Sequence, residues 1–139
     1  MGYKVNEQFL NAFIALDKVC CAKFGVPTGG VTDYVNRLIN SRFAPGRDDV
    51  LPKLVRYTNI RNRLAHEVGA MRQLDEVTKN DVKWLREFEK SVSKKKDPIS
   101  LYLRKARRYA RLRRLRTTGI IILLAVALAV AAWIGLSFL

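Results

Sequence analysis

The apolar residues in the N-terminal two thirds of the chain recur at spacings of three and four, which is the period of an amphipathic helix. No segment there shows a convincing alternation with a period of two, so strands are not expected. Four apolar stripes indicate four helices. They are Phe9, Phe13, Leu16 and Cys20; Val31, Tyr34, Val35, Leu38 and Ile39; Leu51, Leu54, Val55 and Thr58, broadened by Ile60 and Leu64; and Val82, Leu85, Phe88 and Val92. The pattern predicts an all-α head, a small bundle of about four helices.

Turn and capping residues lie between these stripes. Pro27-Thr28-Gly29-Gly30 predicts a turn between the first two helices. Asp48 or Asp49 can cap the third helix through its side-chain oxygen. Thr78, with Asp81 three residues later, resembles a capping box and opens the fourth helix.

The last 21 residues, 119–139, carry no charge. As a helix they would be about 31 Å long at roughly 1.5 Å per residue, which matches the hydrocarbon core of a bilayer. A buried core helix of this length would be expected to show a polar stripe, and this run has none. The sequence therefore predicts one C-terminal transmembrane helix.

The formal net charge of +14 is unevenly distributed. Residues 94–116 hold 11 Lys or Arg against one acid, a net of +10, whereas residues 1–93 hold 15 basic and 11 acidic residues, a net of +4. We therefore expect three segments: a helical head at 1–93, a basic linker and juxtamembrane helix at 94–118, and the transmembrane helix at 119–139. The basic positions of the juxtamembrane helix are Arg104, Lys105, Arg107, Arg108, Arg111, Arg113, Arg114 and Arg116.

The basic segment has three interpretations. A positive flank keeps its side of a span in the cytoplasm, which predicts a single-pass membrane protein with a cytoplasmic N-terminal head. A basic helix can also lie on anionic lipid headgroups. Attraction of RNA is the third interpretation, since positive charge binds phosphates regardless of sequence.

The sequence favours neither a metal site nor a cofactor site. Cys20 and Cys21 are adjacent, which disfavours a disulfide between them, and one histidine cannot complete a zinc site with them. We expect both cysteines to be reduced, with Cys20 on a core face. There is no glycine-rich phosphate loop, no carboxylate pair at metal-like spacing and no nucleophile motif.

The most specific pattern is Arg61-Asn62-Arg63-Leu64-Ala65-His66, which contains the only histidine of the chain. RNA carries its own nucleophile, the 2′-hydroxyl, so its cleavage needs proton transfer and stabilisation of negative charge rather than a metal. Histidine can transfer protons near neutral pH, and the planar guanidinium of arginine suits a phosphate. Five residues turn a helix by about 500°, so Arg61 and His66 would point about 140° apart. A two-fold dimer would bring two copies of each together.

This motif resembles the arginine, polar residue, short spacer and histidine of HEPN domains (higher eukaryotes and prokaryotes nucleotide-binding), which are small all-α bundles that include many metal-independent ribonucleases. The resemblance covers about residues 4–93. It implies a homodimeric endoribonuclease, plausibly a toxin or defence effector, in which His66 is general acid or base, Arg61 holds phosphate and Asn62 orients substrate or Arg61. Arg63 falls in the spacer and has no family role. The C-terminal basic helix and span are not fixed features of the family.

Other readings remain open. His66 could cap carbonyls at a helix end or pack structurally, and Arg61 could be solvated or pair with Glu67 or Asp75. Many HEPN domains are non-catalytic, so the alternative is a silent dimer that serves as a membrane-tethered adaptor for RNA or a regulatory partner protein. A simple tether to anionic lipid or RNA through residues 94–116 is the third.

Overall fold

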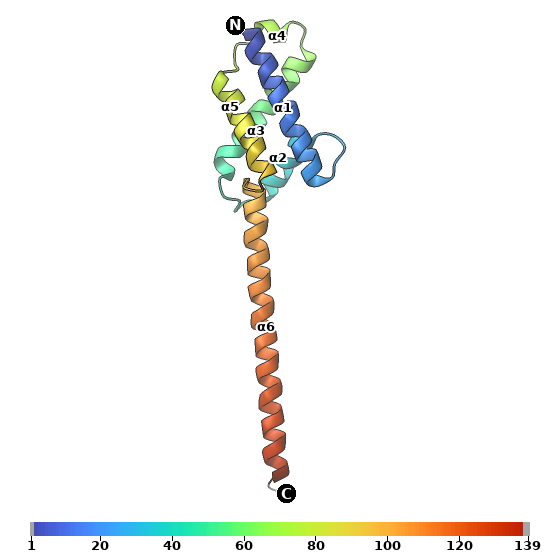
Figure 1. Cartoon of the computed structure of the whole chain (residues 1–139), viewed down its shortest axis with the longest axis vertical. Helices are drawn as coiled ribbons and strands as arrows, with labels where there is room; N and C mark the ends of the chain where they lie inside the picture. Colours follow the sequence, from blue (N-terminus) through green and yellow to red (C-terminus); the bar gives the residue numbers. More distant parts are fainter. Residues whose placement is uncertain (1, 138–139) are drawn as a thin grey trace. The chain divides into compact units, whose positions relative to one another are not determined.

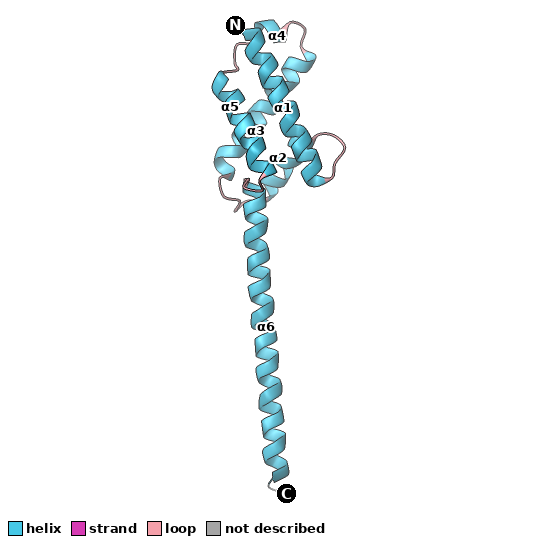
Figure 2. Cartoon of the chain, in the orientation of Figure 1, coloured by secondary structure: helices cyan, strands magenta, loops and turns pink. Residues whose placement is uncertain are grey.

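The computed structural model describes residues 2–137, and every regular element in that range is an α-helix (Figures 1 and 2). The helices are α1 Gly2–Phe24, α2 Gly30–Asn40, α3 Arg47–His66, α4 Ala70–Gln73, α5 Lys79–Ser93 and α6 Pro98–Ser137. The all-α prediction is confirmed. The four expected head helices correspond to α1, α2, α3 and α5, and the short α4 is additional. The chain divides into two compact units, Met1–Tyr102 and Leu103–Leu139, and each is described by itself.

In the first unit, which we call the head, α1 lies against α2, α3, α4 and α5. Its stripe of Phe9, Phe13, Leu16 and Cys20 is buried as predicted. Aromatic rings connect the other helices to it: Tyr57 of α3 packs edge-on against Phe9, with ring centroids 5.5 Å apart. A core of this kind is stabilised mainly by the apolar surface it removes from water.

Local signals fix the helix boundaries. At the start of α5 the Thr78 side chain accepts from the Asp81 backbone N–H, and the Asp81 side chain accepts from the Thr78 backbone N–H at 2.8 Å. The predicted capping box is therefore confirmed. The expected cap of α3 was wrong: Gly46, at φ 75°, precedes the helix, with no side-chain cap. The Arg47 N–H instead donates to the Ala44 carbonyl at 3.2 Å, and the Val50 N–H makes the first helical hydrogen bond, to the Gly46 carbonyl at 3.1 Å.

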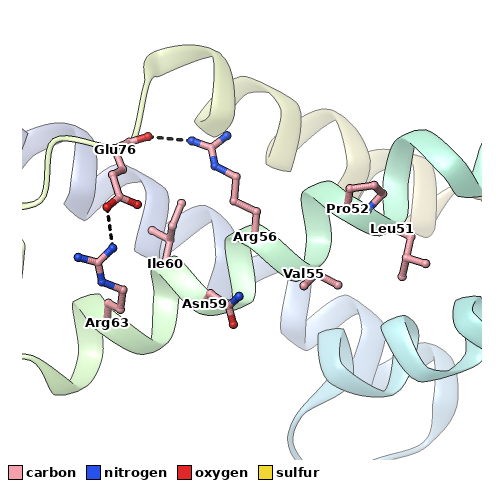
Figure 3. A pocket seen from close by; sticks show the side chains of 8 residues that line it. All are labelled: Leu51, Pro52, Val55, Arg56, Asn59, Ile60, Arg63 and Glu76. Carbon is pink, nitrogen blue, oxygen red and sulfur yellow. Dashed lines mark hydrogen bonds and ion pairs between the residues drawn. The ribbon is translucent and has the colours of Figure 1, made fainter.

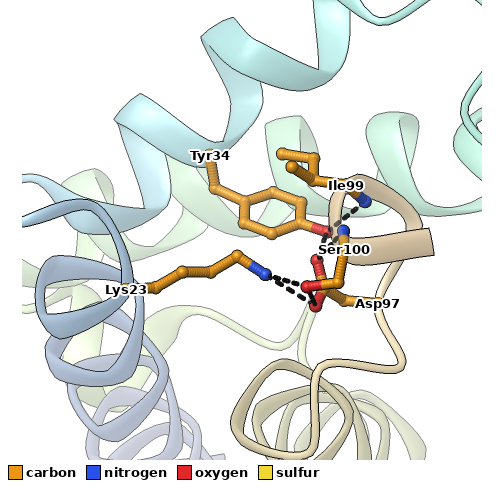
Figure 4. Close-up of polar contacts among 5 residues, drawn as sticks. All are labelled: Lys23, Tyr34, Asp97, Ile99 and Ser100. Atoms are coloured by element: carbon orange, nitrogen blue, oxygen red, sulfur yellow. Dashed lines mark hydrogen bonds and ion pairs between the residues drawn. The ribbon is translucent and has the colours of Figure 1, made fainter. Parts of the chain in front are cut away.

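The first turn of α6 belongs to the head. Asp97 is completely buried, and its carboxylate accepts from Lys23 Nζ at 2.7 Å and from the Tyr34 hydroxyl at 2.7 Å (Figure 4). Ser100 adds its hydroxyl at 2.6 Å and its backbone N–H at 3.2 Å. Asp97 thus caps α6 and connects it to α1 and α2. The compact unit consequently extends past the expected boundary at residue 93, because the residues around Asp97 are packed into the core rather than forming a linker.

The second unit, Leu103–Leu139, is helical over its described residues. It contributes the segment that is long and apolar enough to cross a membrane, with a mean hydropathy of 2.5 in the best window and none of that window buried. By length and composition this supports the expected span; residues 138 and 139 of that span lie outside the described residues. The eight basic side chains named for the juxtamembrane helix are all exposed.

Candidate functional site

The core face of α3 sets where the motif residues point. Leu54, Tyr57, Ile60 and Leu64 are buried, and this fixes the rotation of the helix. The motif lies in the last two turns of α3. Arg61 is half-buried at the edge of the core face, and Asn62 and His66 are exposed. His66 is the last residue of the helix.

The two motif arginines have different surroundings. Arg63 pairs with Glu76 at 2.6 Å and with Glu67 at 3.3 Å, and the hydrogen bond and negative charge of Glu76 raise its pKa above the usual value. Arg61 donates to the Asn62 side-chain oxygen at 3.1 Å, and no carboxylate pairs with it among residues 2–137. Glu67 is thus directed to Arg63. The positive charge of Arg61 is therefore not neutralised by an acid of the described chain.

The surroundings of His66 argue against a structural role. Its side chain makes no hydrogen bond within the described part of the chain, and it lies outside the core. The end of α3 is instead closed by backbone groups, with Glu67 N–H donating to the Arg63 carbonyl at 2.9 Å. An exposed imidazole without a protein partner is available for proton transfer to a bound molecule.

Arg61 and His66 are not brought together within one chain. Because α3 is a regular helix through both residues, they point about 140° apart, and Asn62 projects between them. Asn62 and His66 are four residues apart and so lie on adjacent turns of one face. One head therefore presents the Arg61 guanidinium and the His66 imidazole on the two sides of an exposed strip of α3.

The sequence prediction for this side of α3 was wrong in part. We expected Leu51, Val55 and Thr58 to share the core face with Leu54. Leu54 is fully buried and Leu51 is half-buried and packs against the core, whereas Val55 is 42% exposed and Thr58 is half-buried. The uncharged residues follow one another at spacings of four and three along this second face, which we call the α3 seam. The seam comprises Leu51, Val55, Thr58, Asn62 and Ala65.

Uncharged residues at such spacing on an exposed face are typical of helices that pack against another helix. The Thr58 hydroxyl donates to the Leu54 carbonyl at 2.8 Å, so it does not need a partner outside its own helix. Asn62, in the middle of the strip, is the one seam side chain with an amide.

A cavity of about 650 Å³ adjoins one side of the seam (Figure 3). Its charged groups are already paired: Arg56 donates to the Glu76 carbonyl at 2.9 Å and lies 3.4 Å from Asp81, and Arg63 holds the Glu76 carboxylate. Neither Arg61 nor His66 lines the cavity. Its lining residues are Leu51, Pro52, Val55, Arg56, Asn59, Ile60, Arg63 and Glu76.

The model of a family of unknown function (DUF6548) matches residues 7–121. The chain belongs to this family. The match includes α1 to α5 and the basic part of α6, and it ends just inside the uncharged run. The comparisons with curated proteins and with solved structures gave no match. The description of DUF6548 states no activity, so the resemblance to HEPN domains stays a prediction.

No cluster of three or more His, Cys, Asp or Glu side chains that could hold a metal occurs among residues 2–137 of this DUF6548 chain. Cys20 and Cys21 are both free thiols. Cys20 is buried on the core face as predicted, and burial raises the pKa of its thiol to about 12. A thiol with so high a pKa is a poor nucleophile, so Cys20 is a core residue.

Proposed function

We propose that this DUF6548 chain is a membrane-anchored, metal-independent endoribonuclease whose active site is shared by two protomers. The observation that supports this best is the contrast between the two motif arginines. Arg63 is neutralised by Glu67 and Glu76, whereas the Arg61 side chain, among the described residues, meets only the neutral amide of Asn62. Arg61, which stands at the arginine position of the HEPN motif, is thus the arginine whose positive charge is available to a phosphate.

The proposed chemistry is transfer within the RNA itself. A neutral His66 removes the proton of a 2′-hydroxyl, and the freed oxygen attacks the adjacent phosphorus. The bond to the 5′-oxygen breaks, and that oxygen takes a proton from a protonated histidine. The products are a 2′,3′-cyclic phosphate and a 5′-hydroxyl. Arg61 stabilises the additional negative charge on the phosphoryl oxygens, and the Asn62 amide orients Arg61 or the substrate.

The dimer supplies what one head lacks. A single chain has one histidine and holds it about 140° from Arg61. Two heads joined by their α3 seams about a two-fold axis would contribute two histidines and two arginines to one cleft. One imidazole can then act as base while the other acts as acid. The lack of charge along the seam supports this contact, because charges are disfavoured at the centre of an interface.

The membrane part of the proposal rests on charge. The helical segment 103–118 is strongly basic and directly precedes the uncharged run. Positive residues stay on the cytoplasmic side of a span, so we propose a single-pass protein with the head in the cytoplasm, where RNA is present. A cytoplasmic ribonuclease held at a membrane suits a toxin or defence effector, and such an enzyme needs a regulatory partner that keeps it silent.

The test is cleavage of RNA by the detergent-solubilised full chain in EDTA. We expect cleavage by the wild type, and a loss of about 10² or more in rate for His66→Ala and for Arg61→Ala. Arg63→Ala is the matched control, since it removes a neighbouring arginine whose charge is already paired; its rate should stay close to wild type. Equal rates for wild type and His66→Ala would exclude this chemistry.

One observation favours a second function. The cavity beside the α3 seam has apolar walls and no free charge, which suits a protein or small-molecule partner better than RNA. A silent HEPN-like dimer that recruits a partner to the membrane would use this surface. Such an adaptor would show no cleavage in the assay above and would retain its partner in the His66→Ala variant. A plain tether to lipid or RNA through residues 94–116 would need neither α3 nor His66.

A further inference from the structure

The end of the head from which α6 emerges carries an exposed aromatic ring. Phe43, in the loop between α2 and α3, is 87% exposed, and Ile39 at the end of α2 is 48% exposed. The loop around Phe43 is fixed on both sides. Ser41 N–H donates to the Arg37 carbonyl at 3.0 Å, Ala44 N–H donates to the Ser41 carbonyl at 3.0 Å, and Ala44 itself is buried. Phe43 therefore projects from an ordered turn and not from a loose segment.

This loop lies beside the first turn of α6. A side chain built on Gly46 would come within 3.9 Å of Pro98 Cγ. Within the head, the loop before α3 and the start of α6 are at the same end, and α4 is at the other end (Figure 1). Phe43 and Ile39 are thus close to the point where the chain leaves the head for the uncharged run.

The same end is basic. Arg42 is exposed next to Phe43, and Lys94, Lys95 and Lys96 are exposed just before α6. The nearest acid in sequence to Lys94 and Lys96 is Asp97, which is buried and already paired with Lys23. The loop is followed by Asp48 and Asp49, of which Asp48 pairs with Arg47 at 3.2 Å. Cationic side chains therefore outnumber the exposed acids at this end.

We propose that this end of the head is a docking surface for an anionic lipid bilayer, in which Phe43 enters the interface and Arg42, Lys94 and Lys96 contact headgroup phosphates. An aromatic ring surrounded by basic residues is what an anionic interface attracts, through both burial and charge. This inference rests on the proposed membrane anchoring. It is independent of RNA cleavage.

The bilayer is within reach. Residues 103–118 join the head to the uncharged run, and as a helix they extend about 24 Å at roughly 1.5 Å per residue. Because the segment is of this length as a helix, the docking surface is held within about 24 Å of the start of the uncharged run.

The experiment places a fluorescent label on the full chain in vesicles. Phe43→Cys is made in a Cys21→Ser background, labelled with the environment-sensitive NBD group, and reconstituted into vesicles with and without phosphatidylglycerol. Cys20 can stay, because its buried thiol has a pKa raised to about 12 and reacts poorly. Val68→Cys is the matched control: Val68 is also fully exposed, at 102%, but precedes α4 at the other end of the head.

We expect the label at position 43, and not at 68, to shift to shorter wavelength and to be quenched by bromine-substituted lipids in anionic vesicles. Neutral vesicles, high salt, or replacement of Lys94 and Lys96 by Gln should weaken both effects. Flotation of the vesicles reports the anchoring separately. If the chain floats with the vesicles but labels at positions 43 and 68 give the same solvent-like emission, the proposed docking surface is excluded and the anchoring is not. A chain that fails to float would overturn the anchoring as well. A response at 43 to added RNA but not to anionic lipid would assign the surface to RNA instead.

Discussion

Arg63 Nη1 lies 2.6 Å from Glu76 Oε1, and this ion pair determines which arginine of the motif is available. Glu76 belongs to the segment between α4 and α5, and it also accepts from Arg56 through its carbonyl oxygen. The acids near the end of α3 are thus used by Arg63 and Arg56. Had Glu67 or Asp75 paired with Arg61, a purely structural role for the motif would be favoured. Their actual placement leaves Arg61 without an acid among the described residues, with Arg61 and His66 on the two sides of the α3 seam and Asn62 between them.

The α3 seam gives the first prediction. Val55→Glu places a charge on the α3 seam, and a two-fold contact through the seam would bring one such charge from each copy into the same interface. Like charges brought together at an interface cost several kcal/mol, so the dissociation constant of the proposed dimer of residues 1–102 should rise more than tenfold. Light scattering over a concentration series measures this. Arg86→Glu, at an exposed position of α5, is the control and should leave the dimer intact. A wild-type head that is monomeric at tens of micromolar yet cleaves RNA would contradict the shared site.

The buried carboxylate of Asp97 gives the second prediction. Asp97→Ala leaves Lys23 without its carboxylate partner, with only the Ser100 hydroxyl oxygen to accept from it, and removes the acceptor of the Tyr34 and Ser100 hydroxyls. Removing one member of a buried, hydrogen-bonded pair costs about 3 to 5 kcal/mol, and urea unfolding of residues 1–102 should show a loss of that order. Asp33→Ala breaks the pair between Asp33 and Arg37, which is largely exposed, and should cost less than about 1 kcal/mol. Similar losses for both variants would mean that the Asp97 cluster stabilises little.

The same cluster predicts how stability depends on pH. Burial alone would raise the pKa of Asp97, but hydrogen bonds from Lys23, Ser100 and Tyr34 lower it below its usual value. Asp81 behaves alike, with hydrogen bonds from Thr78 and Tyr57 outweighing burial, so its pKa is also lowered. Below about pH 4 the unfolded chain then binds more protons than the folded one. The free energy of unfolding should therefore be constant near neutrality and fall as the pH drops from about 4 through the folded pKa values. In Asp97→Ala the fall should be shallower.

Much of this fold follows from short-range pattern. The stripe of α1 and the capping box of α5 are set by residues three or four apart, and both were predicted correctly. Gly30 shows what such patterns miss. It was placed in a turn, yet it begins α2, and a side chain there would come within 2.4 Å of the Asp17 carbonyl and the Cys21 nitrogen of α1. Only the three-dimensional approach of two helices reveals that this glycine is required.

The predicted core face of the third helix was partly wrong for a related reason. Leu51, Leu54, Val55 and Thr58 fit one broad stripe, because residues three and four apart share a face. The contact of Tyr57 with Phe9 rotates α3 so that only part of the stripe is buried. Likewise, the sequence pattern places Asp97 in a charged linker, because its partners Lys23 and Tyr34 are distant in sequence. The motif residues could be identified from their spacing. Whether the Arg61 charge is available to a ligand could not, because this depends on the pairing of Glu76 with Arg63.

The last prediction concerns the membrane. The uncharged run and its basic flank predict that the full chain resists extraction by carbonate, and that protease reaches the head only from the cytoplasmic side. Deleting 119–139 removes the apolar surface that holds the chain in the bilayer, so the truncated protein should become extractable by carbonate. Because residues 103–118 and the basic end of the head remain, it should keep a weaker association with anionic membranes that is lost at high salt.

Replacing Arg107, Arg108 and Arg111 by Gln in the truncated chain should abolish most of that residual binding, and the same change in the full chain should leave carbonate resistance intact. If the truncated protein remained carbonate-resistant, the anchor would lie elsewhere. If protease reached the head from outside, the positive flank would not set the orientation, and a head on that side would not meet cellular RNA.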